Sequence, residues 1–145
     1  MNLLIIHGPN LNFLGLREPA IYGSLTLAQL NAMIRKYAAS NRAKVRLFQS
    51  NCEGAIIDLV ARHYKWADAL IINPAAYTHY SYAIRDAIKA SGLPAVEVHL
   101  SDIKKREPFR RVSVTKAACL KQIYGLGPLS YIKAIDFCLG LGRRQ

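Results

Sequence analysis

The chain has 145 residues, of which 52% are hydrophobic and 20% are charged, and its 20 Lys and Arg against 9 Asp and Glu give a formal net charge of +11. This composition is typical of a single globular domain over residues 1–145 and excludes a disordered chain, while no apolar run approaches the roughly 18 residues that cross a membrane. The three cysteines form no CxxC pair, so we expect neither a disulfide framework nor a zinc site, and we expect a cytoplasmic location.

Short segments rich in aliphatic and β-branched residues recur along the chain and predict its strands. The first covers residues 2–6; because the start of the chain lacks a basic leader and a small-residue cleavage site, we interpret this run as a strand rather than as a signal peptide. Further strands are expected at 44–49, 69–74 and 95–100, and a weaker one near 120–124.

Helical segments lie between the expected strands. Thr26 or Ser24 is expected to cap a helix whose apolar residues recur three and four apart, and Asn51 is expected to cap the next helix. A third helix is expected around 82–90, and a last one over about 131–139.

This alternation predicts an α/β fold, a flavodoxin-like three-layer sandwich with a five-stranded parallel sheet. Ligands bind to such sheets outside the carboxyl ends of the strands. Polar side chains gather beyond the first, third and fourth expected strands, so that this one edge brings together Asn10, Arg17, Tyr22, Asn73, His79, His99 and Ser101. The convergence predicts a functional site at that edge.

The segment REPAIYG places Arg17 five residues before Tyr22. A tyrosine has an ordinary pKa near 10, so only about one molecule in a thousand is ionised at pH 7, and a close arginine can lower that pKa by about one to three units. The pair is therefore either a catalytic base with its electrostatic partner or a stacked, half-exposed loop pair.

His99 ends a strand beside Ser101, and Glu97 lies two residues earlier on the same face. A histidine at this position is a plausible general acid with a carboxylate behind it. The alternative is a structural histidine, with Glu97 as the partner of an arginine on a helix.

Other polar residues leave similar alternatives open. Asn10 and Asn73 adjoin prolines and are either turn residues or groups that hold a water or substrate hydroxyls. His79 is either a contact at a helix cap or a ligand donor. Arg110 lies in a basic stretch that is either solvated or, because arginine binds carboxylates with two donors, part of a substrate site.

Motifs of several enzyme classes are missing from the sequence. The segment GLG, residues 125–127, lacks the third glycine of a dinucleotide fingerprint, and there is no HExxH, GxSxG or cluster of metal ligands. We therefore expect neither a cofactor nor a metal.

Four segments, HGPNLNFLGLREPAIYG, QSNCEGAIID, NPAAYTHYSYAIRDAI and VEVHLSDIKKREPFR, occur in the order and spacing of one known family. The chain closely resembles the type II 3-dehydroquinases, lyases that dehydrate 3-dehydroquinate to 3-dehydroshikimate through an enolate, by anti elimination, in the shikimate or quinate pathway. The resemblance covers about residues 2–110 well and the remainder more loosely.

The resemblance implies a role for each matching residue. Tyr22 would remove the C2 proton, Arg17 would lower the pKa of Tyr22, and Asn10 would stabilise the enolate with a held water. His99, oriented by Glu97, would protonate the departing C1 hydroxyl. The matching substrate-binding positions are Asn73, His79, Asp86, Leu100, Ser101 and Arg110.

The same resemblance implies a homo-oligomer, a dodecamer built from trimers, in which Asp86 reaches a neighbouring subunit's site. The chain departs from the family pattern at Cys52, at Asp102 and after Arg110, where a histidine-containing stretch is more usual. None of these changes removes a catalytic group, but the lining around Arg110 is affected.

The basic composition supports a competing hypothesis, a flavodoxin-like module that binds a nucleotide or RNA through its surface. The basic residues are scattered, and neither a zinc-finger spacing nor an aromatic and basic RNA-binding motif is present. A solvated surface is favoured over a nucleic-acid site, and a small anionic substrate remains compatible with the charge.

Overall fold

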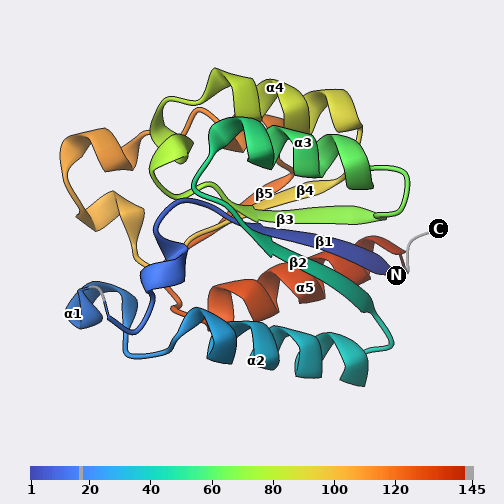
Figure 1. Cartoon of the computed structure of the whole chain (residues 1–145), viewed down its shortest axis with the longest axis horizontal. Helices are drawn as coiled ribbons and strands as arrows, with labels where there is room; N and C mark the ends of the chain where they lie inside the picture. Colours follow the sequence, from blue (N-terminus) through green and yellow to red (C-terminus); the bar gives the residue numbers. More distant parts are fainter. Residues whose placement is uncertain (17, 143–145) are drawn as a thin grey trace.

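The computed structural model describes residues 1–16 and 18–142, with the backbone alone described at Tyr22. The described residues form a five-stranded parallel sheet in the order β2-β1-β3-β4-β5, which confirms the predicted α/β class (Figure 1). The strands are β1 (Asn2–His7), β2 (Lys44–Gln49), β3 (Ala69–Asn73), β4 (Ala95–Val98) and β5 (Lys121–Ile123).

Strands β1 and β3 lie at the centre of the sheet and are buried over almost their whole length, since both of their faces are covered by helices. Their register pairs Leu3 with Ala69 at one end and His7 with Asn73 at the other. Two polar residues therefore meet at the carboxyl end of an otherwise apolar strand pair.

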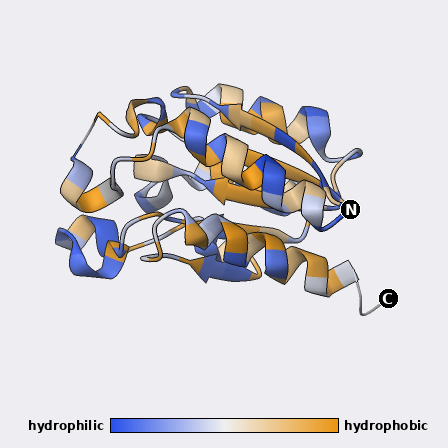
Figure 2. Cartoon of the chain, turned by 90° about the horizontal axis from the view of Figure 1, so that it is seen from below, coloured by the Kyte–Doolittle hydropathy of each residue, from blue (hydrophilic) through white to orange (hydrophobic). Residues whose placement is uncertain are grey.

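Helices α2 (Leu27–Ser40) and α5 (Leu129–Gly142) cover one face of the sheet, and α3 (Glu53–His63) and α4 (Tyr82–Ser91) cover the other (Figure 1). Figure 2 shows hydrophobic and hydrophilic residues alternating along these helices, as expected for amphipathic elements packed on a sheet. The result is the predicted three-layer arrangement. No helix of the described residues is long and apolar enough to span a bilayer.

The helix boundaries test the predicted caps. Thr26 caps α2 as expected, and its side chain and that of Gln29 form a reciprocal capping box. The prediction for Asn51 is wrong, because Cys52 occupies the N-cap of α3. The Asn51 side chain instead accepts a hydrogen bond from the backbone N–H of Asn10, at 2.9 Å. Asn51 thus ties two loops together rather than starting a helix.

The loops that leave the carboxyl ends of the strands contain short helices that the sequence pattern does not predict. They are η1 (Leu11–Phe13), α1 (Pro19–Tyr22), η2 (Ala75–His79), η3 (Ile103–Lys105), η4 (Pro108–Arg111) and η5 (Lys116–Ala118). Elements of three to five residues are too short to show an amphipathic period. Strand β4 also ends at Val98, so that His99 and Leu100 already belong to a loop.

Candidate active site

A cavity of about 150 Å³ lies at the carboxyl edge of the sheet. Its lining contains seven of the residues that the sequence predicted for the site, namely Asn10, Asn73, His79, His99, Leu100, Ser101 and Arg110. Segments that are up to 100 residues apart in the sequence therefore converge, as the rule for parallel sheets requires. The remaining lining is Pro9, Leu11, Leu14, Ala75, Ala76, Ile103 and Arg106.

The glycine of the first loop allows this convergence. A Cβ on Gly8 would lie 2.7 Å from the backbone oxygen of Asn73 and equally close to Pro74, so no other residue fits here without moving the backbone. The N–H of Gly8 donates to that same Asn73 oxygen at 2.7 Å. Asn10, two residues after Gly8, has a φ of 66°, in the left-handed region that asparagine tolerates.

His99 is held from two directions. Its backbone N–H donates to the carbonyl of Ile123 on β5 at 2.9 Å, and its Nε2 lies 2.7 Å from Oε1 of Glu97. Glu97 and His99 therefore share one face, as their spacing predicts. Because Nε2 faces the carboxylate, Nδ1 is the ring nitrogen left for a ligand in the cavity that His99 lines.

Glu97 is fully buried beneath His99 and is surrounded by hydrogen-bond donors. Ser113 Oγ lies 2.9 Å from Oε2, Thr115 Oγ1 lies 2.5 Å from Oε2, and Gln122 Nε2 donates to Oε1 at 2.7 Å. Burial by itself raises the pKa of the carboxyl, but the bonds from His99, Thr115 and Gln122 outweigh it and hold the pKa of Glu97 below its ordinary value. Glu97 is thus a buried carboxylate that stays ionised.

These three donors were not predicted from the sequence. Gln122 is the register partner of Glu97 in the pair β4–β5, so an inspection of the polar residues of the weak fifth strand could have found it. Ser113 and Thr115 lie in the stretch after Arg110 that departs from the family pattern. Two hydroxyl residues spaced i and i+2 are too common a pattern to indicate a carboxylate partner.

His79 ends η2, and its Nδ1 donates to the carbonyl of Val112 at 2.7 Å. That bond leaves Nε2 as a hydrogen-bond acceptor when the ring is neutral. Burial, followed by the nearby charge of His99 and Arg110, lowers the pKa of His79 despite the bond to Val112, so the neutral ring is favoured at pH 7. The cavity therefore receives an acceptor from His79.

Two arginines line the cavity. Arg110 was expected, and its Nε lies 2.9 Å from Oε2 of Glu107. Arg106 was missed because it belongs to the basic run KKRE, which looked solvated, yet its side chain is only 13% exposed. Nη2 of Arg106 lies 4.0 Å from Oε2 of Glu18, the residue before α1. The sequence contains one indication of a role for Arg106, because the tripeptide Arg-Glu-Pro that begins with the expected site residue Arg17 occurs again at 106–108.

Four of the expected residues are absent from the described lining of the cavity. Glu97 lies behind His99, to which it is bonded. Arg17 lies outside the described residues, and so does the side chain of Tyr22, although its backbone is the last residue of α1. Asp86 is exposed on α4 and is not part of the lining. No group of three or more His, Cys, Asp or Glu that could hold a metal ion occurs in the part of the chain that the structure describes.

The chain was compared with known proteins. The family model described as "Dehydroquinase class II" matches residues 1–139. A 3-dehydroquinate dehydratase from Clostridium botulinum (strain Okra / Type B1) is 51% identical over 138 residues, which cover 95% of this chain and 94% of the relative. A 3-dehydroquinate dehydratase from Carboxydothermus hydrogenoformans is 50% identical over 141 residues, covering 94% and 92% of the two chains.

Solved structures give the same result. The type II dehydroquinase from Butyrivibrio crossotus superimposes with a TM-score of 0.94 at 49% identity, covering 95% of this chain and 97% of the other. The type II dehydroquinase from Propionibacterium acnes gives a TM-score of 0.92 at 36% identity and covers 96% of both chains. The similarity therefore extends over both the fold and nearly the whole sequence.

Proposed function

The chain belongs to the class II dehydroquinase family and is a 3-dehydroquinate dehydratase, and on this premise we propose that it forms 3-dehydroshikimate by anti elimination through an enolate. Tyr22 removes the C2 proton, and His99 protonates the hydroxyl that leaves C1. The observation that carries this proposal is the buried Glu97–His99 pair at a cavity lined by asparagine, histidine and arginine side chains.

Loss of the C1 hydroxyl requires an acid, because hydroxide is a poor leaving group. His99 can supply the proton from Nδ1, since Nε2 is bonded to Glu97. Glu97 in turn fixes the plane of the ring and stabilises the charge of the imidazolium. The bonds from Ser113, Thr115 and Gln122 support this role, because they keep the carboxylate ionised and immobile.

Removal of the C2 proton requires a strong base, because this proton is only weakly acidic even beside a ketone. A tyrosinate meets this need if the site keeps it ionised, and each unit by which its pKa falls corresponds to about 1.4 kcal/mol. Arg17 provides a charge that is never lost near neutral pH. The contact of Arg106 with Glu18 supports the assignment, because it joins a residue of the cavity lining to the loop that contains Arg17 and Tyr22.

The other cavity residues bind the substrate and its enolate. Asn10, with a held water, stabilises the enolate oxygen, while Asn73 and neutral His79 bind hydroxyl groups. The carboxylate is bound by Arg110 and by the backbone N–H groups of Leu100 and Ser101. The ketone of the substrate itself acidifies the C2 proton, so the proposed reaction uses no cofactor.

The proposal includes assembly and location. We assign to the chain a homo-oligomer, a dodecamer of trimers, in which Asp86 contributes to a neighbouring site, and a cytoplasmic role in the shikimate or quinate pathway. Asp86 is exposed on α4, and Tyr82 at the start of the same helix is 63% exposed, so this helix offers both a carboxylate and an aromatic ring to a neighbouring subunit. A small anionic substrate, rather than nucleic acid, accounts for arginines in a concave site.

The test is the turnover of 3-dehydroquinate with no metal or nucleotide added, followed by the ultraviolet absorbance of the conjugated product. Tyr22→Phe keeps the ring and removes only the hydroxyl, so we expect unchanged thermal unfolding and nearly complete loss of kcat. Arg17→Ala is expected to be nearly as damaging and to raise the basic pKa of the pH–rate profile. A Tyr22→Phe variant that retained a tenth of the wild-type rate would contradict the tyrosinate mechanism, where a loss on the order of 10²-fold or more is expected.

A further inference from the structure

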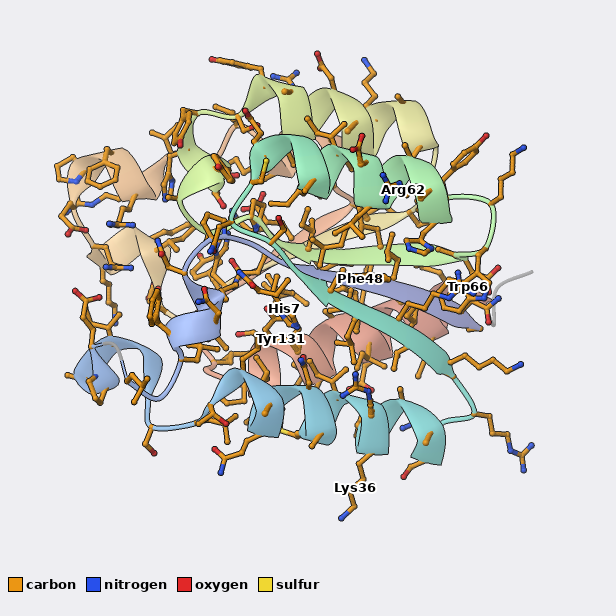
Figure 3. The ribbon with its side chains drawn as sticks, in the orientation of Figure 1. His7, Lys36, Phe48, Arg62, Trp66 and Tyr131 are labelled. Atoms are coloured by element: carbon orange, nitrogen blue, oxygen red, sulfur yellow. The ribbon has the colours of Figure 1, made fainter. Side chains whose placement is uncertain are left out.

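A buried polar network lies directly behind the cavity, and the proposed mechanism does not use it. His7, the last residue of β1, is completely buried between the sheet and α5. Its Nδ1 lies 2.8 Å from the hydroxyl of Tyr131 on α5, and its Nε2 lies 2.8 Å from Oδ1 of Asn31 on α2. Figure 3 shows His7 and Tyr131 next to each other at the centre of the molecule.

The network reaches the cavity through Asn73. His7 and Asn73 are register partners in the strand pair β1–β3, so their side chains leave the sheet side by side on one face. Because His7 bonds Tyr131, this register also brings the Asn73 amide to the tyrosine hydroxyl, where as a donor group it works against the rise in the pKa of Tyr131 that burial causes. Asn73 lines the cavity and is only 4% exposed. One end of the network is therefore a residue that we assign to substrate binding.

The chemistry of these groups gives the network a direction. The carbonyl oxygen of Asn31 can only accept, so Nε2 of His7 must carry the proton, and a neutral His7 then has Nδ1 as an acceptor for the hydroxyl of Tyr131. Burial supports both states, because it lowers the pKa of His7 to about 4 and raises the pKa of Tyr131 far above its ordinary value. Because the Tyr131 hydroxyl donates its proton to Nδ1 of His7, its oxygen can take part in a further hydrogen bond only as an acceptor.

That acceptor fixes the amide of Asn73. Oδ1 accepts the backbone N–H of Ala75 at 3.0 Å, which leaves the NH₂ group of the amide to face the Tyr131 oxygen. A flip of the amide would set its oxygen against the Tyr131 oxygen and its NH₂ against the N–H of Ala75, leaving buried groups mismatched at both ends. The second N–H of Asn73 is therefore the group left for a ligand.

We propose that Asn31, His7 and Tyr131 form a positioning network that holds the amide of Asn73 in one orientation, with an N–H presented to an oxygen atom of the substrate. This inference rests on the proposed function of the cavity and adds to it. Tyr131 and His7 touch no substrate; they act through Asn73. Their effect is on binding, because Asn73 contacts the substrate in both the ground state and the transition state.

The first experiment is a double-mutant cycle in the assembled enzyme. Tyr131→Phe removes only the hydroxyl, and we expect it to raise KM about tenfold while kcat changes by less than about twofold. In an Asn73→Ala background the same change should leave KM unaltered, because no amide remains to be oriented. A matched control is Tyr37→Phe, which removes another tyrosine hydroxyl between α2 and α5. That hydroxyl donates to Oδ1 of Asp136 at 2.5 Å, and its loss should leave KM unaltered in both backgrounds.

A second variant covers the case in which Tyr131→Phe fails to fold. Asn31→Ala removes the outer acceptor from a half-buried helix position, where alanine favours the helix, and should raise KM only when Asn73 is present. The inference is overturned if either variant leaves KM at the wild-type value, or if it raises KM equally with and without Asn73, since a general loss of packing would act in both backgrounds.

Binding without turnover separates this inference from the proposed function. Quinate carries the same carboxylate and hydroxyl groups but no ketone, so it cannot be dehydrated, and its affinity can be measured by calorimetry for all the variants. Absence of turnover in the wild-type protein would contradict the proposed function alone. An affinity for quinate that falls about tenfold in Tyr131→Phe, but is unaltered by that change in the Asn73→Ala background, would support the network.

Discussion

The carboxylate of Glu97 is fully buried and accepts hydrogen bonds from four side chains, of which His99, Thr115 and Gln122 hold its pKa below the ordinary value. A buried charge of this kind is expensive unless it is completely hydrogen-bonded. Gln122 on β5 and Ser113 and Thr115 in the segment after Arg110 supply three of those bonds. Of the four donors, only His99 lines the cavity. The arrangement is explained if the charge is needed to orient and stabilise a protonated His99.

Replacement of Glu97 by glutamine tests this role. Glu97→Gln keeps the shape but can present an NH₂ group to Nε2 of His99, which disfavours the tautomer and the charge that the acid step needs. We expect kcat to fall on the order of 10²–10⁴-fold with a much smaller change in KM. Glu53→Gln is the matched control, since Glu53 accepts a hydrogen bond from Ser81 between α3 and α4, is not part of the cavity lining, and should leave kcat unaltered when replaced. A Glu97→Gln enzyme with a kcat within about tenfold of wild type would show that Glu97 is structural.

At the scale of elements, the runs rich in aliphatic and β-branched residues predict β1 to β4 to within two residues at each end. The pattern is continuously hydrophobic in the buried strands β1 and β3, whereas the edge strand β2 mixes polar and apolar residues. The loops beyond them could not be predicted in the same way. Cys52 displaces Asn51 as the cap of α3 because Asn51 is engaged by Asn10 from another loop, a contact over 41 residues. Long-range contacts of this kind also place Arg106 in the cavity, although its own segment looks like a solvated run.

The site itself was predictable in outline. The rule for strand ends places Asn73, His79 and His99 at one edge from spacing alone, and the cavity confirms that these residues come together. The roles of Arg17 and Tyr22 rest on the family resemblance, since no periodicity distinguishes a catalytic loop tyrosine from a packed one. The network behind Asn73 was not predicted, because only the fold brings α2 and α5 against His7.

The loop between β4 and η5 offers a test at the scale of elements. Arg106 lines the cavity with a side chain that is only 13% exposed, so we expect Arg106→Gln to raise KM for the anionic substrate about tenfold or more. Lys105→Gln removes the adjacent charge, whose side chain is 84% exposed, and should change KM little at physiological salt. Equal effects of the two changes would mean that net charge, rather than a cation in the cavity, attracts the substrate.

At the scale of the whole molecule, one predicted and described site residue, Asp86, belongs neither to the cavity lining nor to the Glu97–His99 pair behind it. Asp86 is exposed on the outer face of α4, and no hydrogen bond or ion pair to it occurs among the described residues. An exposed acidic residue is ordinary, but the proposed assembly gives it a site to complete in another copy of the chain. In a closed ring of identical subunits, each copy would give its Asp86 to one neighbour and receive one in return.

Subunit mixing tests this exchange. Asp86→Ala and Tyr22→Phe should each be nearly inactive, but when they are dissociated, mixed and reassembled, a site with Tyr22 from one subunit and Asp86 from its neighbour is restored. Random assortment in equal amounts restores about one site in four, and sedimentation should show that the mixture has the mass of the wild-type assembly, far above the 16.2 kDa of one chain. Tyr22→Phe mixed with Glu97→Gln is the matched control, because both changes damage groups that one subunit must supply together, so every hybrid site stays defective. A fully active monomer, or a mixture of Asp86→Ala with Tyr22→Phe that regains no activity, would contradict the exchange of Asp86 between subunits.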